Sequence, residues 1–187
     1  YKKILKMVTF EELKQRQYIK NLEKTEKDQY VSFHLDNYKL DIISAANFLN
    51  NKNAKYAAIA GYYAVLNITL WYFAKYFNLK ISEKDVGVHK NCQVVLDKFV
   101  KDQKLKEKIL SLLTEAEKEF TSFTVLKKKK EETLPLILKQ SADKRKKYTY
   151  YSSQKALPQD SDKIMEARNF VEHVVKPYIS IMEKLQC

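Results

Sequence analysis

Few side chains in this chain have the types and spacing that catalysis or metal binding requires. The three histidines, His34, His89 and His173, lie far apart, and the two cysteines are Cys92 and Cys187. His89 and Cys92 could share one helical face, but a structural zinc site takes four ligands. The chain also lacks a glycine-rich phosphate loop, a nucleophile elbow and a CxxC or HExxH pair. Common nucleotide hydrolases and zinc enzymes are therefore disfavoured, and we expect neither a metal nor another cofactor.

Positive charge is concentrated in one part of the chain, residues 127–155, called the basic segment below. It holds ten Lys or Arg and three acids, a net +7 of the formal +12. Its stretch KRKKYTYY alternates cations with aromatic rings, which can hold phosphates and stack on bases. The alternative is a solvated lysine face with tyrosines packed on the protein. The predicted contacts to RNA or another polyanion are Lys128, Lys129, Lys144, Arg145, Lys146, Lys147, Tyr148 and Tyr150.

Residues 56–74 contain no charged side chain. Such a stretch is typical of either the central helix of a bundle or a membrane span. In a bilayer the polar groups of Asn67 and Thr69 would lie at hydrocarbon depth, whereas a protein core can supply hydrogen-bond partners. We therefore predict a buried central helix at about residues 54–77 and no membrane association.

Two residues of this region carry specific expectations. Gly61 costs a helix about 1 kcal/mol relative to alanine, so a close packing contact is expected there. Asn78 is the predicted end of the helix, because asparagine tolerates the left-handed conformation that ends many helices.

The composition predicts an all-α fold. Two glycines and three prolines are too few turn formers for a many-stranded sheet. We expect a single domain over residues 1–187, an up-and-down bundle of about five to six helices around the central one. Residues 1–30 are a predicted N-terminal helical extension, and the basic segment a loop with a short helix. The remaining helices are expected near residues 35–49, 89–100, 104–123 and 162–185.

Short local signals mark the ends of several helices. Thr9 and Glu12 form a capping box that opens the first helix, and the charged stretch 23–29 is expected to separate it from the second. Asp160 and Ser161 can cap the last helix, which Pro177 should kink.

The cysteines and the N-terminal residues indicate the cellular compartment. Two distant cysteines argue against a secreted disulfide scaffold and for a reducing compartment. The apolar run of YKKILKMVTF is too short for a signal peptide. We therefore expect a cytoplasmic protein.

The order of these patterns resembles the HEPN superfamily of small helical bundles. The pattern in this sequence comprises GYYAVLNITLWYFAKYFN, a helix opened by His89 and ending in FV, an Arg followed by tyrosines, and an AR-x-FV helix. The similarity covers about residues 35–180. It implies a homodimer and either an RNA-cleaving toxin or defence nuclease, often paired with a nucleotidyltransferase antitoxin, or a non-catalytic binding domain.

The nuclease signature of this family is an Arg, often followed by a polar residue, and a His four to six positions later. RNFVEH fits it, which implies catalytic roles for Arg168, Asn169 and His173. His173 would handle the proton of the attacking ribose hydroxyl and Arg168 would stabilise phosphate charge, without a metal. Five residues of α-helix rotate the direction by about 140°, so a partner chain could complete the site.

A second alignment places the signature earlier, in KRKKYTYY, where Arg145 is followed by Tyr150 and Tyr151 and not by His. The site would then be degenerate, and Arg168 would pair with Glu172 one turn on. Two functions follow: a metal-independent endoribonuclease acting on RNA as a homodimer, or a non-catalytic module. The second would bind nucleic acid, nucleotide or an acidic partner such as the antitoxin.

Overall fold

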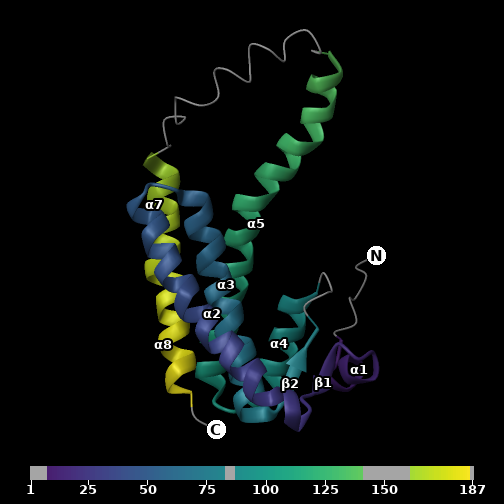
Figure 1. The fold of residues 1–187 in the computed structure, drawn as a ribbon. Coiled ribbons are helices and arrows are strands. Elements are labelled where there is room, and N and C mark those ends of the chain that lie inside the picture. The colour runs from purple at the N-terminus through teal and green to yellow at the C-terminus, as the bar shows by residue number, and fades with distance from the viewer. Residues whose placement is uncertain (1–7, 83–86, 141–160, 186–187) are drawn as a thin grey trace, which may run out of the picture.

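A computed structural model describes residues 8–82, 87–140 and 161–185, with the backbone alone for 125–140. These residues form an all-α helical bundle with one small strand pair, as predicted (Figure 1). In chain order the elements are α1 (Phe10–Gln15), β1 (Ile19–Asn21), α2 (Lys24–Asn50), α3 (Ala54–Phe77), β2 (Leu79–Ile81), α4 (Val88–Phe99), α5 (Gln103–Gln140), α7 (Ser161–Phe170), the π-turn η2 (Val171–Val175) and α8 (Lys176–Lys184).

The long helices alternate in direction. Figure 1 shows α2 and α3 running in opposite directions, α5 returning along them, and α7 with α8 running back towards the C-terminus. Helix α3 contacts α2, α4, α5, α7, η2 and α8, and therefore lies at the centre of the bundle.

Helix α3 has the predicted bounds and is buried along most of its length. It is also, within the described ranges, the helix long and apolar enough to cross a membrane, and 83% of its apolar window is buried. Its polar side chains have partners: Asn67 Nδ2 donates to Asp41 Oδ2 at 2.8 Å, and the hydroxyls of Thr69 and Tyr178 lie 2.7 Å apart. The core thus satisfies the groups that hydrocarbon would leave unpaired.

Both specific expectations for α3 are confirmed. Asn78 ends the helix in the left-handed region, with φ 56° and ψ 37°. A Cβ atom at Gly61 would lie 3.0 Å from Phe170 Cε1 and 3.0 Å from Val175 Cγ2, so only glycine fits without movement of these side chains.

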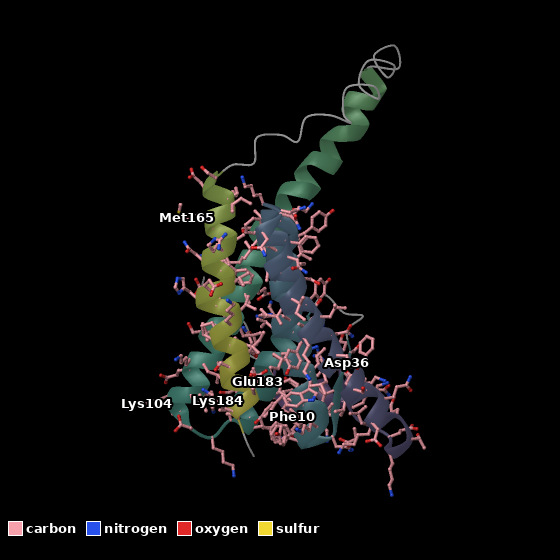
Figure 2. All side chains as sticks on the ribbon, turned by 60° about the vertical axis from the view of Figure 1, so that its left-hand side comes forward. Phe10, Asp36, Lys104, Met165, Glu183 and Lys184 are labelled. Atoms are coloured by element: carbon pink, nitrogen blue, oxygen red, sulfur yellow. The ribbon has the colours of Figure 1, made fainter. Side chains whose placement is uncertain are left out.

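A tyrosine links the second and last helices. Tyr38 on α2 donates a hydrogen bond of 3.1 Å to Glu183 Oε1 on α8, where Figure 2 shows Glu183 near the C-terminal end. Burial, and then the hydrogen bond and charge of Glu183, raise the pKa of Tyr38 to about 12. The phenol is therefore neutral and remains a donor at physiological pH.

The N-terminal region differs from the predicted helical extension. The capping box of Thr9 and Glu12 is present, but α1 has only six residues and Gln17 follows it with φ 59°. The chain then forms β1, whose Ile19 lies opposite Ile81 of β2 in an antiparallel pair. Both isoleucines are buried, so apolar burial outweighs the helical pattern here.

The predicted break over residues 23–29 is wrong. Helix α2 begins at Lys24, and Glu23 and Glu26 form a second capping box at its start. The charges that suggested a linker instead form the first turn of a long helix, because lysine and glutamate are good helix formers.

Helix α5 is longer than predicted. It does not end near Phe123 but continues to Gln140, so the backbone of residues 127–140 is helical and not a loop. Lysine and glutamate again favour this. Figure 1 shows this end of α5 projecting beyond the other helices. Residues 141–155 of the basic segment lie outside the described residues.

Candidate functional site at the His173 groove

The predicted catalytic residues lie on α7 and on the π-turn η2. The N–H of Lys176 donates to the carbonyl of Val171, five residues back, and Pro177, which has no N–H to give, follows directly. The irregularity expected near Pro177 is thus a π-turn. Ser161 is the first residue of α7, and Asp160 lies outside the described residues.

Two of the three predicted residues meet in one groove. Asn169 and His173, both exposed, line an open groove of about 610 Å³ between α5 and the α7–η2 run. Met165, seen on the upper part of α7 in Figure 2, lies on its wall. Arg168 is exposed but does not line the groove. One chain therefore does not bring Arg168 and His173 together here.

The groove is acidic. Glu115 and Glu119 of α5 face Asp162 and Glu166 of α7 across it. Burial raises the pKa of Glu119, and the nearby charge of Glu166 raises it further. Lys163 pairs with Glu166 and offsets one of these charges. A phosphodiester placed in this groove would meet net repulsion from the carboxylates.

These acidic residues are the part of the site that sequence reasoning missed. Glu115 and Glu119 are four residues apart on one helix, and Asp162 and Glu166 are four apart on another. Each pair therefore forms an acidic face, which is a readable signal. That the two faces oppose each other depends on packing alone.

The alternative pairing of Arg168 with Glu172 is wrong. The Glu172 carboxylate instead accepts hydrogen bonds of 2.7 and 2.8 Å from Lys176 Nζ. Arg168 and Lys176 are each four residues from Glu172, and a glutamate followed by its cation four residues later is the more favourable order on a helix.

The other histidines lie in the core. His89 is 3% exposed, with Nε2 3.3 Å from Glu117 Oε2 and its ring stacked on Tyr62. Burial lowers the pKa of His89 and Glu117 opposes this. His34 is fully buried and donates from Nδ1 to Asn67 Oδ1 at 2.8 Å. Across residues 8–82, 87–140 and 161–185, no three His, Cys, Asp or Glu side chains form a group that could hold a metal ion.

Only two of the predicted polyanion contacts lie within the described residues. Lys128 and Lys129 belong to the far end of α5, and the other predicted contacts, Lys144, Arg145, Lys146, Lys147, Tyr148 and Tyr150, lie outside the described residues. Within α5, residues 103–124 hold four Lys and four Glu, whereas residues 125–140 hold five Lys and two Glu. Charge on this helix is therefore neutral along the bundle and positive where it projects.

The fold and the groove define an all-α bundle with an acidic groove at a π-turn. No family model, curated protein or solved structure matches the chain. Membership of the HEPN superfamily therefore stays a prediction from the residues quoted above.

Proposed function

We propose that this protein is a non-catalytic helical module of HEPN type that binds RNA through its basic segment. The observation that carries the proposal is the separation of charge along α5. The acidic groove lies beside its neutral part, and the helix then extends past the other helices into the basic segment. A polyanion is attracted to the projecting end and repelled from the groove.

The test is the salt dependence of RNA binding. The quadruple variant Lys144→Gln, Arg145→Gln, Lys146→Gln, Lys147→Gln removes four charges from the basic segment. We expect its affinity for a single-stranded RNA to fall about 30-fold near 0.1 M salt. The slope of log affinity against log salt should decrease by about three. Fluorescence anisotropy over a salt series measures both quantities.

A matched control removes four exposed lysines from the bundle. Lys24, Lys39, Lys52 and Lys90 are exposed and, within the described ranges, make no side-chain ion pair. Their replacement by glutamine changes net charge equally, and we expect a loss below about threefold, since scattered charges act only at long range. Equal losses in both quadruple variants would refute a basic-segment site.

The second candidate function is metal-independent RNA cleavage, and one observation favours it. Asn169 and His173 lie four residues apart on the wall of one groove, as a phosphate-side amide and a proton-transfer group would require. Arg168 does not line that groove, so a second copy of the chain would have to supply the positive charge on the phosphate.

Complementation between inactive copies tests this candidate. His173→Ala and Arg168→Ala should each abolish cleavage in the presence of a chelator. Mixing them should restore about one quarter of the activity, since half of the dimers would be mixed and each would hold one intact site of two. The surface control Arg16→Ala should be fully active. Cleavage by His173→Ala at the wild-type rate would exclude the candidate.

A further inference from the structure

A second cavity lies at the opposite end of the bundle from the projecting end of α5 (Figure 1). It has a volume of about 670 Å³ and forms where α3 and α4 end and α5 begins. Lys104, labelled in Figure 2, marks the start of α5. Phe77 and Phe99 stack with ring centroids 4.1 Å apart and form much of the apolar wall. Tyr72, Val100, Leu105 and Leu185 extend this wall, and Lys98, Lys101 and Asp102 also line the cavity. This size and lining are typical of small-molecule sites.

One positive charge at this cavity has no neutralising partner among the described residues. Lys98 is paired with Glu11, and its ammonium lies 3.9 Å from the centre of the Phe10 ring. Asp102 accepts the backbone N–H of Leu105 at 2.7 Å and so caps α5. Lys101 lines the cavity, is exposed, and makes no ion pair with any residue that the structure describes.

We infer that this cavity binds an amphipathic monoanion, a carboxylate with a medium-length apolar tail. The tail lies against Phe77, Phe99 and Leu105, and the carboxylate meets Lys101. A multiply charged phosphate fits less well, because Asp102 stands at the same rim and Lys98 is already paired. A neutral ligand would leave Lys101 unused. None of the residues lining this cavity belongs to the basic segment, and the inference does not depend on RNA binding.

Decanoate is the probe, titrated by calorimetry below its micellar concentration. Hexanoate lacks four methylene groups and should bind about a hundredfold more weakly if the tail is buried. Decyltrimethylammonium has the same tail and the opposite charge, and should not bind measurably. Decanoate should also shift the backbone amide resonances of Phe99, Lys101 and Leu105, which locates the site.

Charge reversal at position 101 tests whether Lys101 itself contributes to decanoate binding. Lys101→Glu should weaken decanoate binding about tenfold, because attraction at the rim becomes repulsion. Lys104→Glu, three residues along and outside the lining, makes the same change in net charge and should stay within about twofold. No decanoate binding, equal affinity of the two variants, or equal binding of decanoate and hexanoate would each overturn the inference.

Discussion

Replacing Gly61 with leucine is expected to lower the free energy of unfolding by about 3 kcal/mol, at the upper end for overpacked cores. The first added carbon alone would lie 3.0 Å from Phe170 Cε1 and from Val175 Cγ2. The remaining carbons would have to enter space that α7 and η2 already fill, since Phe170 and Val175 are buried there. Urea denaturation followed by circular dichroism measures the loss.

Alanine at position 61 combines two opposing effects on stability, a gain in helix propensity and a loss from tighter packing. It gains about 1 kcal/mol of helix propensity over glycine, and it loses a similar amount by displacing two side chains, so the net change should be near zero. At Gly87, among the described residues, an added Cβ would meet only Asn91 Oδ1, at 4.0 Å. Gly87→Leu should therefore cost less than about 1 kcal/mol. A Gly61→Leu variant as stable as the wild type would show that α3 and η2 do not cross at this contact.

Replacing Asn67 with leucine is expected to lower the free energy of unfolding by about 3 kcal/mol, the second large loss, because the buried His34 and the half-buried Asp41 each lose a hydrogen bond. Asn67 accepts from His34 Nδ1 and donates to Asp41 Oδ2, both at 2.8 Å, and so connects two residues of α2 through one side chain of α3. Leucine has a similar volume but offers neither group. Thermal and urea unfolding measure the change.

Asn47→Leu is the matched control, since Asn47 is an exposed asparagine on α2. Its replacement should leave stability within about 0.5 kcal/mol, as is usual for surface positions. If Asn67→Leu were equally mild, the contacts from α3 to His34 and Asp41 would not contribute to stability.

Asp41 adds a pH dependence to the Asn67 variant. Burial raises the pKa of Asp41, and the hydrogen bond from Asn67 lowers it in part. A carboxyl with a raised folded-state pKa is stabilising while protonated and loses that contribution as pH rises through the folded pKa. Without Asn67 the pKa of Asp41 rises further, so the deficit against wild type should be larger at pH 7 than near pH 4. Urea midpoints at the two pH values test this.

Local signals predicted much of the helical framework. The bounds of α3, the left-handed Asn78, the capping box at Thr9 and the close contact at Gly61 all agree with the structure. Each depends on residue type and its nearest neighbours in the chain, where propensity and capping act directly.

Errors arose where distant segments compete with local preference. The pattern that predicted a helix through Ile19 gave way to a strand, because Ile19 and Ile81 bury each other in a pair formed across α2 and α3. The lysines that suggested a loop after Phe123 instead continue α5. A short window of sequence around Ile19 does not contain Ile81, whereas the extension of α5 agrees with the helix propensity of its own lysines and glutamates.

By itself the sequence determined the helical class, the uncharged helix at the centre and the position of the excess positive charge, because these follow from composition and local propensity. Only the tertiary structure decided that Asn169 and His173 share a groove with four carboxylates while Arg168 stays outside it. It also placed Lys101 at an apolar cavity. The physical reason is that side chains far apart in the chain interact only after the helices have packed, and the packing decides which helix faces meet.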